Sequence, residues 1–446
     1  MREACGVRRF IGAFPGSRRS ASPTFGSSSA GLRHFRARRL MKSWLLCMAL
    51  LVTHAGLNAQ TDWVAIRAGR LLPISSKPVR DGVILLKNGQ IEAIGPGITI
   101  PPGAKIIEAT NDVVMPGLVD AGCLGAVRGD ANEQSNEITP DFHILAALDP
   151  ESRRLQQAVQ TGVTTVYLAP GWENVVGGRG AVIRPVGRTI ADMVLKEEGA
   201  LTFSMGRTPA RGNRIPYGQK PGSFYFRRPT TTMAVNWMLR KVLFDAQQGE
   251  AQTAETKESR SILQTALRHE QPVHIRVRRA IDIRTALRLV DEFGLKIVLI
   301  ECTEGYKMAD ELARRQIPVI LGPFYFHARE LGPNFEGQEV CWNNAGLLHR
   351  AGVKVMLASQ SASAVDLLSV AAYAVRHGLP REAALKAITL SPAECLGVAN
   401  RVGSLDTGKD GNLIILSGDP LQPTTLIKRV LLQGKTIYQA EQGDPR

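Results

Sequence analysis

The sequence is poor in cysteine, and after its first sixty residues it has no long apolar run. Its 446 residues include six cysteines, whose scattered spacing contains no CxxC pair of the kind that holds a metal. No stretch is long and apolar enough to cross a membrane. The glycines of Gly177–Gly180 lack the spacing of a phosphate-binding fingerprint. These absences exclude a cysteine-based metal centre, a membrane span and a dinucleotide-binding domain.

The positive charge of the chain is concentrated at its beginning. The formal net charge is +15, and the first forty residues hold nine arginines and a single acid, Glu3. The remainder is only mildly basic and shows neither a nucleic-acid-binding motif nor a basic stripe with interleaved aromatic residues. The sequence therefore predicts no nucleic-acid partner.

A secretory signal peptide is expected within residues 1–59. The segment from Met41 has one lysine, a short apolar run and small residues ending at Ala59, which is the pattern of an export signal. Met1 and Met41 both stay open as the start site, and a buried first helix is the alternative. The pattern predicts an exported protein, either periplasmic or secreted.

Both ends of the mature chain read as β-structure. Asn88-Gly89 separates two apolar runs and suits a type I′ turn, so this segment predicts a β-hairpin. Near the C-terminus, Gln433-Gly434 separates two similar runs. We expect residues 60–115 and 404–446 to form one small composite β-sandwich domain.

The middle of the chain alternates strands and helices. Ile283, Ala286, Leu287 and Val290 share one face of a predicted helix, which Gly294 ends. Strands are predicted at residues 272–277, 295–300, 317–321 and 353–358. Repeated β/α units predict a (β/α)8 TIM barrel over residues 116–403. Residues 171–260 are less periodic, and strands three and four are not placed within them.

Several motifs, taken in order, resemble those of the amidohydrolase superfamily. "VVMPGLVDAG" (Val113–Gly122) is similar to the entry into the barrel of these enzymes, and "GSLDTGKDGNLIILSGDP" (Gly403–Pro420) to the return into their β-sandwich. Between them stand "TGVTTVYLAPG", "NVVGGRGAVI", "TEGYKMADEL", "AGVKVMLASQS" and "EAALKAITLSPAECLGV". This order resembles the imidazolonepropionase-like branch, whose members hydrolyse cyclic amides.

The resemblance implies a divalent metal, usually zinc, at the C-terminal mouth of the barrel. Family members hold it with an H-x-H motif after strand one, histidines ending strands five and six, and an aspartate ending strand eight. The metal lowers the pKa of bound water, and the aspartate acts as base during attack on a carbonyl.

This sequence departs from the family at the metal-ligand positions. No histidine occurs between residues 55 and 142, and no aspartate between residues 311 and 365. A glycine or leucine offers no ligand, an arginine is a permanent cation, and a glutamine cannot act as a base. The residues at the five positions are Gly122, Leu124, Arg276, Glu301 and Gln360. We therefore expect no cofactor.

The altered mouth is rich in arginine. Arg276 and Arg278 share the inward face of strand five with His274, and Glu301 ends the neighbouring strand. Two interpretations stay open: an arginine–glutamate pair that replaces the charge of the metal, or a site that binds an anionic ligand such as a carboxylate. In the same alternation Cys123 and Cys302 point away from the interior as packing residues.

Three functions remain after this reading. The first is a degenerate amidohydrolase that binds a small molecule without metal-dependent hydrolysis. The second is an active hydrolase of non-peptide C–N bonds with an atypical metal or metal-free site that uses Glu301, Asp120 and His327. The third is non-hydrolytic catalysis, such as isomerisation. Arg184 is either a counterpart of the metal-bridging lysine of some relatives or a loop residue. The sequence does not determine whether the protein forms homo-oligomers.

Overall fold

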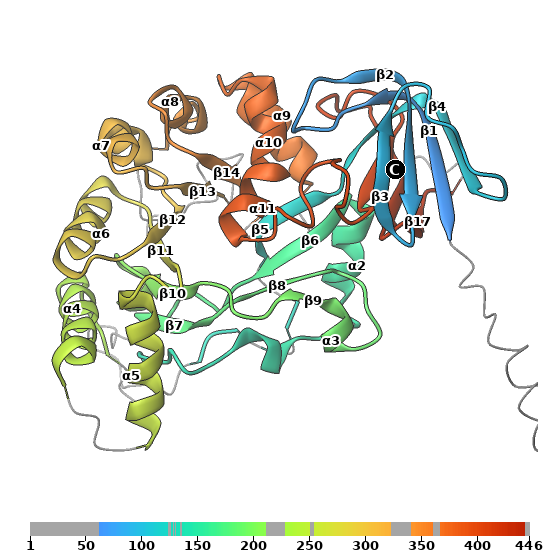
Figure 1. Ribbon diagram of the computed structural model, residues 1–446. Coiled ribbons are helices and arrows are strands. Elements are labelled where there is room, and N and C mark those ends of the chain that lie inside the picture. Colours follow the sequence, from blue (N-terminus) through green and yellow to red (C-terminus); the bar gives the residue numbers. More distant parts are fainter. Residues whose placement is uncertain are drawn as a thin grey trace, which may run out of the picture. The chain divides into compact units, whose positions relative to one another are not determined.

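The computed structural model describes residues 62–123, 126–127, 129, 131–133, 136–210, 228–249, 254–322, 340–359 and 366–441. Leu124, His327 and Gln360 lie outside these ranges. The chain from Thr61 to Arg446 forms one compact unit (Figure 1). The boundaries expected at residues 115 and 404 fall inside that unit and stay predictions.

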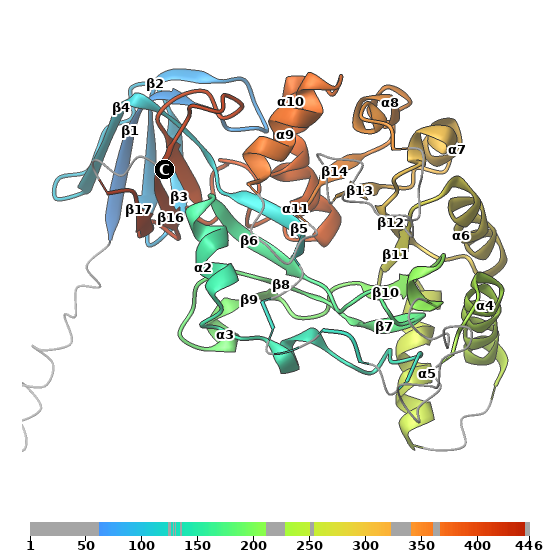
Figure 2. The same ribbon diagram turned by 180° about the vertical axis from the view of Figure 1, so that it is seen from behind.

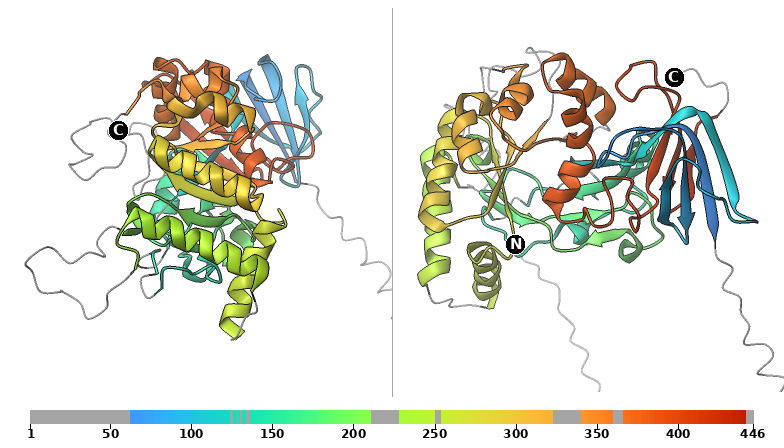
Figure 3. Two further views of the ribbon diagram at one scale, coloured as in Figure 1. Left: turned by 90° about the vertical axis from the view of Figure 1, so that its left-hand side faces the viewer. Right: turned by 45° about the horizontal axis from the view of Figure 1, so that its top comes forward.

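Strands from both ends of the chain build one seven-stranded sheet, in the order β17-β16-β15-β4-β1-β2-β3. The blue and cyan strands of the N-terminal part and the red C-terminal strands lie together in Figure 3. β15 pairs antiparallel with β4, which joins the two parts of the chain. The strands are β1 (Trp63–Leu71), β2 (Val79–Lys87), β3 (Gln90–Gly95), β4 (Lys105–Pro116), β15 (Leu413–Leu416), β16 (Ile427–Leu432) and β17 (Lys435–Gln439).

The two predicted hairpin turns are confirmed, and they meet. Asn88 and Gly89 have φ angles of 51° and 82°, as a type I′ turn requires, and Gln433 and Gly434 have 48° and 73°. The Gly411 N–H donates to the Gly89 carbonyl at 2.7 Å, and the Gly411 carbonyl accepts from Gly434 N at 3.0 Å. A Cβ on Gly89 would stand 2.7 Å from the Gln433 carbonyl oxygen, so glycine is needed there for close approach as well as for its φ.

The middle of the chain is mixed α/β, with helices on the outer side of the strands (Figures 1 and 2). One sheet has the order β14-β13-β12-β11-β10-β7 and the other β5-β6-β8-β9. Their strands are β5 (Leu118–Cys123), β6 (Val163–Leu168), β7 (Val176–Arg179), β8 (Ala181–Ile183), β9 (Val194–Lys196), β10 (Leu201–Ser204), β11 (Val273–Val277), β12 (Ile297–Glu301), β13 (Val319–Leu321) and β14 (Val355–Leu357).

The helices follow the strands as the sequence predicts over the second half. Ile283, Ala286 and Leu287 on α6 are buried, and Gly294 ends that helix in the left-handed conformation at φ 67°. None of the described helices is long and apolar enough to cross a membrane. The α-helices are α2 (Arg153–Gln160), α3 (Ile190–Met193), α4 (Thr232–Gln248), α5 (Ala254–Leu267), α6 (Ala280–Phe293), α7 (Ala309–Arg314), α8 (Asn344–Arg350), α9 (Leu367–Arg376), α10 (Arg381–Ala387) and α11 (Leu390–Leu396).

The region in which the sequence placed no strands departs from a regular β/α alternation. β8 pairs antiparallel with β6, β9 antiparallel with β8, and β7 antiparallel with β10. β7, β8, β9 and β10 have only three or four residues each. Glycines lie between them, and the connection from β7 to β8 is too short for a helix, so the chain turns back directly. β7, β8 and β9 therefore interrupt the parallel order of the neighbouring strands.

Alternation along the strands sorts the apolar side chains into two clusters. Ile275 and Leu299 belong to the large cluster shared with the outer helices. Val298, Ile300 and Met356 belong to a second cluster that also draws on β5 and β6. We refer to the faces that build this second cluster as the inner face. Because both sheets contribute to it, the inner face is common to them.

Candidate functional site

Three charged residues meet where β11 and β12 end. The Arg276 guanidinium donates from Nε to Glu301 Oε1 at 2.6 Å, and Arg278 Nε donates to Glu301 Oε2. Their side chains are 8% and 12% exposed, and that of Glu301 is 6% exposed. The pairing expected between arginine and glutamate is therefore present, and both oxygens of the carboxylate are used. Two guanidiniums against one carboxylate leave the cluster with a net positive charge.

The backbone at the end of β12 holds Glu301 in an unusual conformation. Glu301 has φ 67° and Cys302 has φ 43°, a region that residues other than glycine rarely adopt. The Cys302 N–H donates to the Val277 carbonyl at 2.8 Å, and its carbonyl accepts from Asn344 Nδ2 at 3.0 Å. Such strained residues persist where the surroundings fix them and are frequent at functional sites. The turn directs the Glu301 carboxylate back towards β11.

Two of the three guanidinium nitrogens of Arg276 have hydrogen-bond partners. Its Nη1 donates to Thr208 Oγ1 at 2.7 Å, from the short 3-10 helix Thr208–Ala210 that follows β10. Its Nη2 makes no hydrogen bond within the described part of the chain. A guanidinium nitrogen without a protein partner is suited to an oxygen of an anionic ligand, because N–H···O bonds between charged groups are the strong ones.

His274 lies deeper on the same face of β11 and is not part of the charged cluster. It is 1% exposed, and its ring centroid is 5.0 Å from that of Tyr167. Burial, with a smaller contribution from the charge of Lys196, lowers the pKa of His274 to about 3. The ring is therefore neutral at physiological pH and offers hydrogen bonds without charge.

Asp120 is bound to the backbone and to a serine at the strand ends. Its Oδ1 accepts from Gly122 N and from Ser359 N, both at 3.1 Å, and its Oδ2 accepts from Ser359 Oγ. Ser359 follows β14, so this contact links the ends of β5 and β14, which belong to different sheets. All of these bonds are made within the protein, and they hold Asp120 at the end of β5.

Replacing Asp120 by asparagine is expected to flatten the dependence of stability on pH. Burial raises the pKa of Asp120 from 3.8 to about 6, so its contribution to stability is present below pH 4 and is lost as pH rises through 6. Asp120→Asn should gain up to about 3 kcal/mol over the wild type at pH 7 and little at pH 4. Urea unfolding at both pH values measures this. An equal difference at the two values would contradict the raised pKa.

Cys123 and Cys302 pack away from the inner face, as predicted. Both are buried in the outer cluster, and the described cysteines are free thiols. Burial raises the pKa of each thiol to about 12. A reactive thiolate is therefore not available at either position at neutral pH.

Arg184 lies at the edge of the strands opposite to the charged cluster. It follows β8, which runs antiparallel to β6. Asp120 and Ser359 bring the C-terminal ends of β5 and β14 to one edge, so Arg184 belongs to the other. Its Nη2 donates to Asp410 Oδ2 at 3.2 Å, deep inside the protein. The role of a metal-bridging residue considered for Arg184 is therefore wrong, because it lies at the wrong end of its strand.

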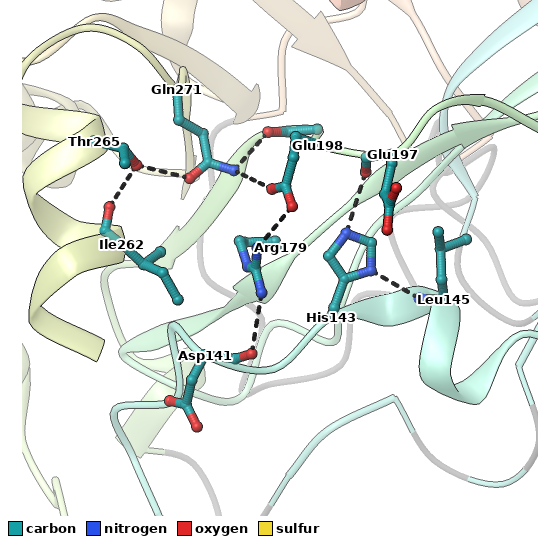
Figure 4. A network of polar contacts seen from close by, with 10 residues as sticks. Asp141, His143, Leu145, Arg179, Glu197, Glu198, Ile262, Thr265 and Gln271 are labelled. Atoms are coloured by element: carbon teal, nitrogen blue, oxygen red, sulfur yellow. Dashed lines mark hydrogen bonds and ion pairs between the residues drawn. The ribbon is translucent and has the colours of Figure 1, made fainter. Parts of the chain in front are cut away.

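A second polar network lies at that opposite edge (Figure 4). Arg179 Nη1 donates to Glu198 Oε1 at 2.8 Å, and Gln271 Nε2 donates to the Gly199 carbonyl at 2.9 Å. His143 contacts the Glu197 carbonyl at 3.1 Å through Nε2. The residues of this network precede β10 and β11 or follow the antiparallel β7. In barrel folds this edge contributes to stability, whereas active sites lie at the C-terminal ends of the strands.

Comparisons with known proteins identify the family of this chain. The model of the "Amidohydrolase family" matches residues 264–439. A crystal structure of an amidohydrolase from Thermotoga maritima MSB8 superimposes with a TM-score of 0.76 at 28% identity, over 84% of this chain and 100% of that one. The chain belongs to the amidohydrolase superfamily.

Two further relatives show how far this amidohydrolase likeness reaches. Amidohydrolase tasK of Hapsidospora irregularis is 24% identical over 387 residues, which cover 76% of this chain but only 38% of that protein. A zinc-bound adenosine deaminase from Xanthomonas campestris has a TM-score of 0.51 at 18% identity, over 84% of this chain and 92% of that one. The latter likeness concerns the fold alone.

The residues at the amidohydrolase metal positions do not fit a metal ion. Gly122 has no side-chain ligand, Arg276 is a cation, and Glu301 gives both oxygens to arginines. The described part of the chain contains no group of three histidine, cysteine, aspartate or glutamate side chains that could hold an ion. We therefore derive no reaction step through a metal.

Three residues of the amidohydrolase mouth were not recognised in the sequence. Thr208 binds Arg276, Ser204 lies beside Arg276 in the pairing of β10 with β11, and Ser359 binds Asp120. Ser204 and Thr202 alternate with apolar residues in "LTFS". That alternation is the signal that could have placed them on the inner face. Thr208 lies in a short 3-10 helix and Ser359 in the loop after β14, and neither carries such a signal.

Proposed function

We propose that this amidohydrolase-superfamily protein binds a small anionic ligand at the mouth of a closed (β/α)8 barrel and lacks metal-dependent hydrolysis. The observation that carries the proposal is the cluster of Arg276, Arg278 and Glu301 at the ends of β11 and β12. Arg276 and Glu301 are at two of the positions for which the family resemblance implies metal ligands. A nearly buried guanidinium, that of Arg276, with one nitrogen that has no partner in the described part of the chain favours an anionic ligand.

Calorimetric titration of the purified chain with small carboxylates tests this function. We expect propionate or a longer carboxylate to bind, whereas its uncharged methyl ester does not. Arg276→Met should weaken the carboxylate at least about tenfold, because loss of a charged hydrogen bond costs about 1.5–3 kcal/mol. Arg268→Met is the matched control, since Arg268 pairs with Glu270 on the surface with 53% of its side chain exposed.

Two results would contradict the proposal. The first is equal affinity for the acid and its ester, which would mean that the charge is not recognised. The second is about one tightly bound metal ion per chain, measured by mass spectrometry on protein purified without chelators. The metal result would favour the alternative, a hydrolase of non-peptide C–N bonds with an atypical ligand set, which the family match also supports.

We also propose that the protein is exported and that a signal peptidase removes residues 1–59. The support is the charged, apolar and small-residue pattern from Met41 to Ala59. The mature chain is expected to begin at Gln60, which intact mass and N-terminal sequencing of periplasmic protein measure. Ala59→Leu should leave the precursor uncut, because these cleavage sites require a small residue. A chain that retains Met41 in the wild type would rule out this export.

A further inference from the structure

Polar side chains without partners line the inner face beside Arg276. Thr202 Oγ1 and Ser204 Oγ on β10, and His274 Nδ1 on β11, are buried and make no hydrogen bond. Leu201, Phe203 and Ile275, which alternate with them, pack in the outer cluster. The unpartnered groups therefore point to the inner face.

Strand pairing places these groups at two successive inward-facing positions along β10 and β11, which we call levels. Ser204 pairs with Arg276, and Thr202 pairs with His274, in the parallel register of β10 and β11. Ser204 thus lies at the level of the guanidinium whose Nη2 is free, and the other two lie one level deeper. The Tyr167 ring packs against His274 and fixes the orientation of its ring.

Buried polar atoms without a hydrogen-bond partner are rare in folded proteins. Nearly all buried hydroxyls and ring nitrogens have hydrogen-bond partners, and an unsatisfied group calls for a specific explanation. Here three such groups stand together on two neighbouring strands, next to an arginine that also has a donor to spare. A ligand that reaches past Arg276 would give partners to all of them.

We propose that the ligand is a small carboxylate that also carries a neutral hydrogen-bonding group, such as an amide. Arg276 binds the carboxylate, and Ser204, with Thr202 and His274 behind it, binds the neutral group. This assignment rests on the anion-binding function proposed above. Hydroxyls both donate and accept, so an amide can find a partner for its N–H and for its carbonyl. Because His274 is neutral, the deeper level offers no charge for a second carboxylate.

A pair of ligands of equal size and shape tests the neutral subsite. N-acetylglycine and 4-methylpentanoate have the same number of heavy atoms and the same charge, but only the first carries an amide. We expect N-acetylglycine to bind the wild-type chain about tenfold more tightly in calorimetric titrations. In Ser204→Ala this preference should fall to about twofold or less, while the affinity for 4-methylpentanoate stays unchanged. Arg276→Met should weaken both ligands.

Thermal unfolding without ligand gives a second readout. If the hydroxyls serve a ligand rather than the fold, Ser204→Ala and Thr202→Val should raise the unfolding midpoint by about 1–2 °C, because an unsatisfied buried group is removed. Thr389→Val is the matched control: Thr389 is fully buried, but its hydroxyl donates to the Leu385 carbonyl at 2.5 Å. That variant should lower the midpoint.

The outcomes separate this inference from the function on which it rests. Equal binding of the two ligands, or a midpoint that falls in Ser204→Ala and Thr202→Val as in Thr389→Val, overturns the neutral subsite and leaves anion binding intact. Failure of both carboxylates to bind the wild type overturns both. A tighter N-acetylglycine complex that loses its preference only in the Ser204 and Thr202 variants supports both.

Discussion

Replacing Glu301 by alanine is expected to lower the free energy of unfolding by about 3–5 kcal/mol. The carboxylate is the shared partner of Arg276 and Arg278, and all three side chains are nearly buried. Without it, Arg276 loses its only charged partner in the described part of the chain, and Arg278 loses one of its contacts. Loss of one partner from a buried ionic cluster is costly because the remaining charges are desolvated and unpaired. Urea unfolding followed by circular dichroism measures the change.

The control for Glu301 is an exposed pair of the same chemistry. Glu270 pairs with Arg268, and the two side chains are 56% and 53% exposed. Glu270→Ala should therefore cost no more than about 1 kcal/mol. A combined variant, Arg276→Met, Arg278→Met and Glu301→Leu, should recover most of the stability, because apolar replacement of a whole buried cluster is often neutral. A cost of Glu301→Ala no larger than that of Glu270→Ala would falsify this account.

The second large effect is expected at Asp410, at the opposite edge of the strands. Asp410 Oδ2 accepts from Arg184 Nη2 at 3.2 Å and from Arg401 Nη2 at 2.9 Å, and its side chain is 2% exposed. Asp410 precedes β15, so the contact joins the seven-stranded sheet to the end of β8. Asp410→Ala should cost about 3 kcal/mol, since the Arg184 side chain is only 10% exposed and would lose its only charged partner in the described chain.

Two comparisons make the prediction for Asp410 specific. Asp245→Ala removes an exposed partner of Lys241 and should cost about 0.5 kcal/mol. Arg401→Met should cost less than Arg184→Met, because the Arg401 side chain is 37% exposed and can be hydrated. The same urea unfolding measures all four variants. If Asp410→Ala and Asp245→Ala cost the same, the buried contact contributes nothing to holding the sheet.

Replacing Glu301 is also expected to affect the proposed anion binding: stability should fall, whereas affinity for an anion should rise. Glu301→Gln keeps the size of the side chain but removes the charge that neutralises Arg276 and Arg278. A folded fraction of this variant would present Arg276 to an anion without its charged partner. The variant is expected to be less stable than the wild type while it binds propionate more tightly, which titration below its unfolding midpoint measures.

Local features of the sequence were predicted well because they depend on neighbours along the chain. Asn88-Gly89 and Gln433-Gly434 favour turns through their own backbone preferences, and the turns form as expected. The apolar period of α6 and the glycine after it determine where that helix lies and where it ends. The adjacency of Arg276 and Glu301 followed from two consecutive β/α units, whose strands are neighbours in a parallel sheet.

Contacts between residues that are far apart in the sequence could not be predicted from local patterns. Asp120 binds Ser359, which is 239 positions away, and Arg184 binds Asp410, which is 226 positions away. Nothing in the local pattern of either segment indicates its partner. The antiparallel strands β7, β8 and β9 were missed because strands of three or four residues are too short for a periodic signal.

The sequence by itself determined the family resemblance, the β-structure at both chain ends and the residue types at the expected metal-ligand positions. These follow from residue identity, because a glycine has no side-chain ligand and an arginine is a permanent cation in any fold. The tertiary structure decided what replaced the ligands: a carboxylate turned back by a left-handed backbone to bind two buried arginines. It also decided that Thr202, Ser204 and His274 remain without partners beside them. Burial and hydrogen bonding are properties of the packed chain, so only the fold reveals which polar groups it leaves for a ligand.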